Sequence, residues 1–176
     1  MAGWIVIALW IPANFGGVPQ PAFQHVRSAE SPIRTLVADG YARSPTVRAL
    51  VDRVEQMSCV VYVATAVKLS QGMRGALLHT AVGRDEMPVL RVLIRANLGR
   101  DEAIAVIAHE LQHVIEAIEH AAAGGRVQMS AVFGELDDTT RGGTIRKYET
   151  DAAIEVTTRV RDELRRGDQF RRTRKS

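Results

Sequence analysis

The sequence predicts one α+β domain, and three observations predict it. A helical apolar stripe covers residues 46–57, three short strand patterns follow it, and two more helical patterns occupy residues 101–120 and about 149–164. The length of 176 residues suits a single domain, and a hydrophobic content of 46% suffices for one core. We therefore expect helices on a small sheet, with no internal repeat.

The pattern of the first 33 residues predicts an N-terminal segment that lies outside this domain. Residues 4–11 form a continuous apolar run that is too short to span a bilayer, and a Pro- and Gly-rich linker follows over residues 12–33. The run has two interpretations: the apolar core of a secretory signal, although no Lys or Arg precedes it, or a strand packed on the domain. Export and a cytoplasmic location both stay open, and membrane contact through this run is the less favoured interpretation.

The folded domain is expected over residues 34–165, followed by a basic tail over 166–176. The formal net charge is +3, and much of the excess lies in this tail. A solvated chain end accounts for such a run of charge. An aromatic content of 5% provides few side chains on which nucleic-acid bases could stack. We therefore expect no nucleic-acid partner.

The helix over residues 46–57 begins at Ser44-Pro45, a helix-start signal. Its apolar stripe is formed by Val47, Leu50, Val51, Val54 and Met57. The stripe has helical spacing, so this face should pack on the core.

Three β-branched runs predict strands over residues 59–64, 76–82 and 89–96. The last two are separated by residues 83–87, which suit a hairpin turn, so we expect a three-stranded antiparallel sheet. Cys59 is the sole cysteine, which excludes an intrachain disulfide and suits a buried strand residue.

The helix over residues 101–120 carries the motif His109-Glu110-Leu111-Gln112-His113. Two histidines four residues apart lie on one helix face, so both imidazoles can bind one metal ion, and Zn²⁺ is the expected ion. Glu110 is the expected general base, because it lies beside the metal and can take a proton from the activated water. His120, near the helix end, is better explained as a solvated residue.

A catalytic zinc site normally has three protein ligands, so a third must come from elsewhere. The residues after His113 lack the glycine and third histidine of the metzincins. Glu149, the first acid of the helical pattern over 149–164, is the favoured third ligand. Glu116 is the main alternative, although its position suits a contact with a histidine or with substrate better, and Asp151 and Glu155 stay open.

This combination resembles the gluzincin group of zinc metallopeptidases, and the short chain resembles the single-domain minigluzincins. The resemblance covers roughly residues 46–165. It implies a zincin-like fold, a zinc-dependent peptidase activity, peptide or protein substrates, and pairing of an extended substrate with an edge strand, expected over residues 89–96. Many gluzincins have an aspartate four residues after the ligand glutamate that supports a histidine, and this chain has Ala153 there.

Two alternatives to a peptidase stay open. One is a non-catalytic zinc-binding domain with a regulatory or scaffold role, and the other is a metal-free interaction domain. The oxyanion-stabilising group is not assigned, with Arg146, Tyr148, Arg159 and Arg161 as neighbours of the site in sequence. Residues 121–141, with a short helix expected over 128–136, are either a flap or a connection.

Overall fold

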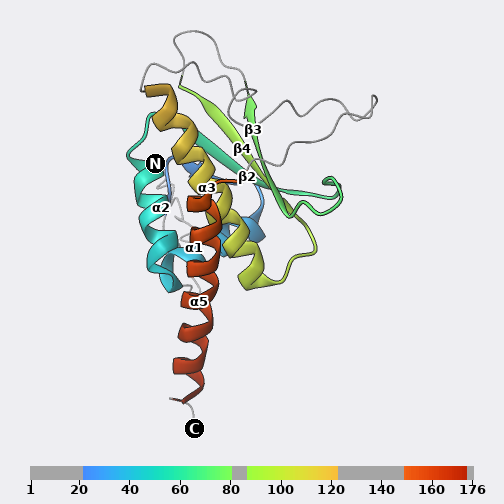
Figure 1. The fold of residues 1–176 in the computed structure, drawn as a ribbon, viewed down its shortest axis with the longest axis vertical. Helices are drawn as coiled ribbons and strands as arrows, with labels where there is room; N and C mark the ends of the chain where they lie inside the picture. Colours follow the sequence, from blue (N-terminus) through green and yellow to red (C-terminus); the bar gives the residue numbers. More distant parts are fainter. Residues whose placement is uncertain (1–21, 81–86, 123–148, 174–176) are drawn as a thin grey trace, which may run out of the picture.

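The computed structural model describes residues 22–80, 87–122 and 149–173, and it has an α+β fold, as predicted. Figure 1 shows the helices gathered on one side of a twisted sheet. In chain order the described elements are β1 (Val26–Arg27), α1 (Ser31–Arg43), α2 (Pro45–Glu55), β2 (Val60–Ala66), β3 (Gly75–Thr80), β4 (Val89–Arg95), α3 (Arg100–Ala122) and α5 (Asp151–Thr173).

The sheet corrects the predicted antiparallel arrangement. Its strand order is β1-β2-β4-β3, so β4 lies between β2 and β3. Strands β1, β2 and β4 are parallel to one another, and only β3 is antiparallel, pairing with β4. The predicted antiparallel pairing of the last two strands is confirmed, but the parallel pairing of β2 with β4 was not predicted. Alternating apolar residues identify strands but carry no information about which strands pair.

The edge strand was also predicted wrongly. Strand β4, the expected edge over residues 89–96, is central, and β3 lies at the edge of the described sheet. The composition of β4 fits a central position: Leu90, Val92 and Ile94 are buried on the helix side, and Val89 and Leu93 are half-buried on the other side. Apolar residues on both faces are typical of strands in the middle of a parallel arrangement.

The domain begins earlier than residue 34. The predicted linker over residues 12–33 includes β1 and the first residues of α1. The Glu55 carboxylate accepts hydrogen bonds from the backbone N–H groups of Gln24, His25 and Val26, at 2.8–2.9 Å, and so fixes this segment against α2. The predicted tail is corrected as well, because α5 continues past residue 165 to Thr173.

The predicted start of α2 is confirmed. The Ser44 hydroxyl accepts a hydrogen bond from the Val47 backbone N–H, at 3.0 Å, and Pro45 occupies the first turn. Glu163 of α5 contacts the same cap through Ser44 and Thr46. The cap therefore also joins α2 to α5.

Helix α3 is the centre of the core, and its predicted extent is confirmed within two residues at each end. It is apolar on most of its circumference because it packs against β3 and β4 on one side and against α1, α2 and α5 on the others. The largest fully buried side chains on α3 are Ile104, Ile107 and Leu111. α3 and α5 run antiparallel, since Glu102 contacts Arg161 whereas Glu116 contacts Thr150.

Cys59 is fully buried, as predicted, and burial raises the pKa of its thiol to about 11.

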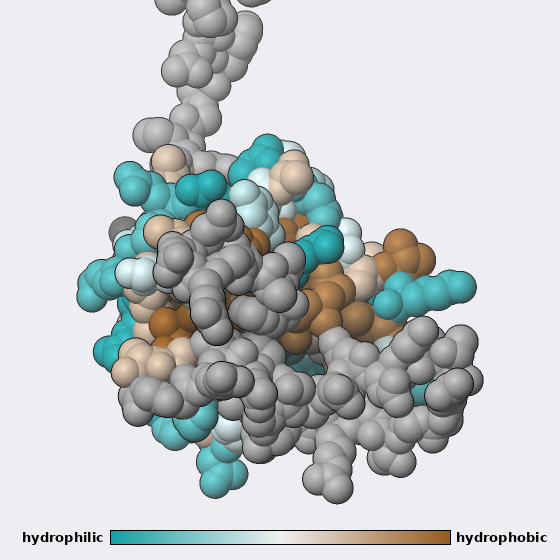
Figure 2. Space-filling view, turned by 90° about the horizontal axis from the view of Figure 1, so that it is seen from above, coloured by the Kyte–Doolittle hydropathy of each residue, from teal (hydrophilic) through white to brown (hydrophobic). Residues whose placement is uncertain are grey.

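No helix in the described part of the chain is long and apolar enough to cross a membrane. Apolar side chains nevertheless reach the surface, among them Val67 (90% exposed) and Ile154 (50% exposed). Seen from above, apolar surface lies between polar side chains (Figure 2).

Candidate functional site

The predicted motif lies in the middle of α3, where that helix contacts both α5 and the edge strand. His109 and His113, referred to below as the histidine pair, face the start of α5. Glu110 lies on the β3 side, next to Gly75. The candidate site is therefore formed by α3, the first two turns of α5 with the residues just before them, and the first residue of β3.

The imidazole rings of the histidine pair point toward each other. Their Nε2 atoms lie 3.1 Å apart, and Glu149 Oε2 lies 3.5 Å from His109 Nε2. Two ligand atoms on one tetrahedral zinc ion are themselves about 3.3–3.4 Å apart, because each lies about 2.0–2.1 Å from the ion. In the described residues no group of three or more histidine, cysteine, aspartate or glutamate side chains is placed to hold a metal ion. The structure does bring the histidine pair and Glu149 together.

Hydrogen bonds at the other ring nitrogens determine the tautomers of the histidine pair. His109 Nδ1 lies 3.2 Å from the Ala153 carbonyl oxygen and 2.9 Å from Thr157 Oγ1, and His113 Nδ1 lies 3.0 Å from Glu116 Oε2. A carbonyl or carboxylate oxygen accepts, so these contacts fit a proton on Nδ1 of each ring. With that assignment both Nε2 lone pairs are directed at the same small volume, which suits a shared cation.

Glu116 supports His113 at Nδ1. Its carboxylate also accepts hydrogen bonds from Gln112 Nε2 at 3.0 Å and from Thr150 Oγ1 at 2.9 Å. Thr150 in turn accepts from the Ala153 backbone N–H, at 3.1 Å, as the first turn of α5 begins. This chain of contacts fixes the start of α5, and therefore Glu149, against α3.

The other acids considered as third ligands lie away from the histidine pair. Asp151 and Glu155 are exposed, and Glu155 forms an ion pair with Arg159 on the same helix. Among the described residues neither acid contacts His109 or His113. Glu149 is the acid that the structure places beside His109.

Glu110 is 6% exposed, and its carboxylate lies against the backbone of β3. A Cβ atom added at Gly75 would lie 2.4 Å from Glu110 Oε1 and 2.7 Å from Val106 Cγ1. Such distances are far below van der Waals contact, so only glycine lets β3 approach the carboxylate this closely. The first residue of the edge strand and the predicted base are therefore neighbours.

Sequence reasoning missed three members of this site. Thr157 and the Ala153 carbonyl support His109 where an aspartate was expected, and Gly75 contacts Glu110. Thr157 could have been noticed as a polar residue next to the buried positions Ala153 and Val160 of α5. Nothing in the sequence signals the role of Gly75, because its neighbours come from another element.

The remaining predicted residues take other positions. His120 is exposed in the last turn of α3. Arg159 and Arg161 form ion pairs with Glu155 and Glu102, respectively. The residues Arg146 and Tyr148 and the expected helix over 128–136 lie outside the described residues.

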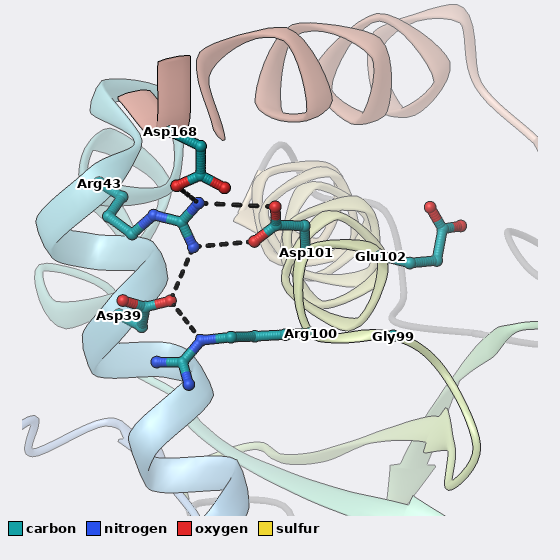
Figure 3. Close-up of a pocket in the computed structure, with 7 residues that line it drawn as sticks. All are labelled: Asp39, Arg43, Gly99, Arg100, Asp101, Glu102 and Asp168. Carbon is teal, nitrogen blue, oxygen red and sulfur yellow. Dashed lines mark hydrogen bonds and ion pairs between the residues drawn. The ribbon is translucent and has the colours of Figure 1, made fainter. Parts of the chain in front are cut away.

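A charged pocket at the other end of α3 is separate from this site. It has a volume of about 520 Å³ and is lined by Asp39, Arg43, Gly99, Arg100, Asp101, Glu102 and Asp168 (Figure 3). Arg43, with 6% of its side chain exposed, lies 2.8–2.9 Å from the carboxylates of three helices, through Asp39, Asp101 and Asp168. Burial opposes its charge, but the carboxylates outweigh burial and raise the pKa of Arg43. The ion pairs of Arg43 with these three aspartates join α1, α3 and α5.

No protein-family model matches the chain, and neither the curated proteins nor the solved structures contain a significant match to it. What the site does must therefore be inferred from its own residues.

Proposed function

We propose that this protein is a zinc-dependent peptidase with a zincin-like domain, in which His109, His113 and Glu149 hold the metal and Glu110 is the general base. The observation that carries the proposal is the histidine pair: two Nε2 atoms lie 3.1 Å apart, and Nδ1 of each ring has an oxygen acceptor within hydrogen-bond distance. Metal-ligating histidines typically have such partners at the second nitrogen. The donor set of two imidazoles and one carboxylate fits Zn²⁺.

A bound zinc ion would supply Lewis acidity, which polarises a carbonyl group and lowers the pKa of water. The chain's own contribution is proton transfer by Glu110. Its carboxylate is held beside Gly75, on the helix face next to the one that carries the histidine pair. In the proposed reaction this carboxylate accepts a proton from the attacking water. It then gives this proton to the leaving amine, so the carboxylate is regenerated after each cycle.

Among the described strands none pairs with the outer edge of β3, and this supports an extended peptide as the substrate. The Arg95 backbone N–H donates to the Arg74 carbonyl at 2.8 Å, and Gly75 is the next residue, opposite Ile94. Backbone groups of successive residues in an antiparallel pair alternate in direction, so the N–H and C=O of Gly75 point away from β4. An edge strand can bind a peptide through such groups, largely independent of its sequence. We assign this role to β3, in place of the strand over 89–96.

Zinc content and turnover together test the proposal. Wild-type protein should contain one zinc ion per chain by elemental analysis, and His113→Ala and Glu149→Ala should lose it or bind it much more weakly. Glu155→Ala is the matched control, since Glu155 is an exposed acid of the same helix. Zinc retained by Glu149→Ala would remove Glu149 from the ligand set, and a zinc-free wild type after reconstitution would overturn the proposal.

Turnover distinguishes a peptidase from a non-catalytic zinc-binding domain. The zinc-loaded wild type should hydrolyse casein, and Glu110→Gln should keep zinc while losing hydrolysis by at least about 100-fold, because the amide cannot accept the proton. A zinc-loaded wild type that cleaves neither casein nor a peptide library would indicate the scaffold alternative.

A further inference from the structure

Three charged side chains form a cluster at the start of α3, about 12 Å along the helix axis from Glu110. Arg161 of α5 donates to Glu102 of α3 through Nε at 2.9 Å and Nη2 at 2.6 Å, and Arg74 contacts the same carboxylate through Nη1. Arg74 and Arg161 keep 58% and 36% of their side chains exposed, against 26% for Glu102. This group, called the Arg74–Glu102–Arg161 cluster below, therefore presents its guanidinium groups to solvent.

The cluster is positively charged and has hydrogen-bond donors to spare. Two guanidinium groups share one carboxylate, which leaves one positive charge in excess. Among the described residues, Arg74 Nε and Nη2 and Arg161 Nη1 have no hydrogen-bond acceptor. Glu102 lies in the first turn of α3, where the helix dipole adds positive potential. Such a group attracts a carboxylate.

The cluster lies where a peptide bound along β3 would leave the site. Arg74 directly precedes Gly75, whose backbone groups point away from β4 and where an added Cβ would lie 2.4 Å from Glu110 Oε1. Glu102 precedes Glu110 by eight residues, which is about 12 Å along the helix axis. An extended peptide advances about 3.3 Å per residue, so the cluster is about three or four residues from the bond to be cut.

We propose that the Arg74–Glu102–Arg161 cluster is a specificity site that binds an aspartate or glutamate side chain of the peptide substrate, on one side of the scissile bond and three or four residues from it. This inference rests on the proposed peptidase function, because it takes the position of the scissile bond from Glu110. A substrate carboxylate would bind the free donors of both arginines. Glu102 holds the two guanidinium groups together and weakens their charge.

The test uses C-terminally amidated peptides in which one glutamate is moved through positions from four before to four after the scissile bond, with glutamine as the reference. The wild type should prefer glutamate about fivefold in kcat/KM at one position, three or four residues from the bond, and added salt should reduce the preference. Arg74→Gln and Arg161→Gln should each abolish it. Glu102→Gln should increase the preference for glutamate, because this substitution removes the carboxylate that competes with the substrate for the two arginines. Arg159→Gln, an exposed arginine of α5, is the matched control and should leave it unchanged.

A binding measurement separates this inference from the proposed function. Zinc-loaded Glu110→Gln should bind the glutamate peptide about fivefold more tightly than the glutamine peptide by fluorescence anisotropy, again dependent on Arg74 and Arg161. Preferential binding without hydrolysis by the wild type would support the acidic-residue site and count against the peptidase. Hydrolysis with no positional preference for glutamate, a preference that survives both arginine substitutions, or no discrimination in either measurement would overturn the inference.

Discussion

Thr157 of α5 holds the imidazole ring of His109 on α3: its Oγ1 lies 2.9 Å from His109 Nδ1. The same hydroxyl donates to the Ala153 carbonyl at 2.9 Å, so its lone pairs are available to the ring N–H. The two contacts orient His109 without a carboxylate. The position where gluzincins often have a supporting aspartate, Ala153 in this chain, contributes its backbone carbonyl instead.

Thr157→Val should weaken zinc binding about tenfold, because the His109 ring loses one of its two hydrogen-bond acceptors at Nδ1. Valine has nearly the same shape as threonine, so the packing at position 157 is kept. A competition titration against a chelator measures the affinity. Thr158→Val is the matched control, since the Thr158 hydroxyl is exposed and donates only to Ile154 of its own helix. Equal affinities for both variants would show that Thr157 does not support the metal site.

Glu116→Ala should also weaken zinc binding, by about 10- to 100-fold, because it removes the acceptor at His113 Nδ1 and the contact that fixes Thr150. Glu119→Ala removes an exposed acid of the same helix and should change the affinity little. The same titration applies. A larger loss in Glu119→Ala than in Glu116→Ala would contradict the assigned role.

Gly75→Ala should lower kcat about 10- to 100-fold and leave zinc affinity unchanged. The added methyl group would lie 2.4 Å from Glu110 Oε1, so the buried carboxylate has to move, and the three atoms nearest to the methyl group belong to Glu110 and Val106. Displacing a catalytic group by about 1 Å can have an effect of this size. Gly99→Ala is the control, because a Cβ there meets nothing within 4 Å. Wild-type kcat in Gly75→Ala would mean that Glu110 is not required in its present position.

How far the sequence predicts this fold depends on how local each signal is. The helix over 101–120 and the cap at Ser44 are set by residues within a few positions of each other, and both predictions are confirmed. The central place of β4 depends on pairing between distant segments, so it could not be predicted from local sequence patterns. The histidine pair was found through its spacing. Thr157 and Gly75 were not, because each contacts its partner across two elements.

Helix α1 was missed for a different reason. Its apolar positions Ile33, Val37 and Gly40 have helical spacing, but Gly40 in mid-helix argues against a helix on propensity. In the structure a Cβ at Gly40 would lie 2.8 Å from Ile104 Cγ2. The glycine therefore marks the closest approach of α1 to α3. Tertiary packing outweighs its low helix propensity.

Arg43→Met should destabilise the protein by about 2–4 kcal/mol, since the removal of a buried charge leaves several carboxylates without their partner. Urea denaturation followed by circular dichroism measures the change. Arg165→Met replaces an arginine with 70% of its side chain exposed and should cost less than about 1 kcal/mol. Similar costs for the two variants would show that the contacts of Arg43 contribute no more than a surface ion pair.

Asp39 should make the stability depend on pH in acid. Burial disfavours its charge, but hydrogen bonds from Arg100 and Arg43 and their positive charges outweigh burial and lower the pKa of Asp39 below 3.8. A carboxylate with a lower pKa in the folded protein stabilises the fold above pH 3.8, and this contribution is lost as the pH falls through the folded value. Asp39→Asn should therefore cost about 1–2 kcal/mol at pH 7 and less as the pH drops below 3.8. Unfolding free energies of both proteins at pH 7, 5 and 3 test this, with Asp162→Asn reporting the effect of losing an exposed carboxylate. A cost that stays constant or grows on acidification would contradict the assigned direction of the shift.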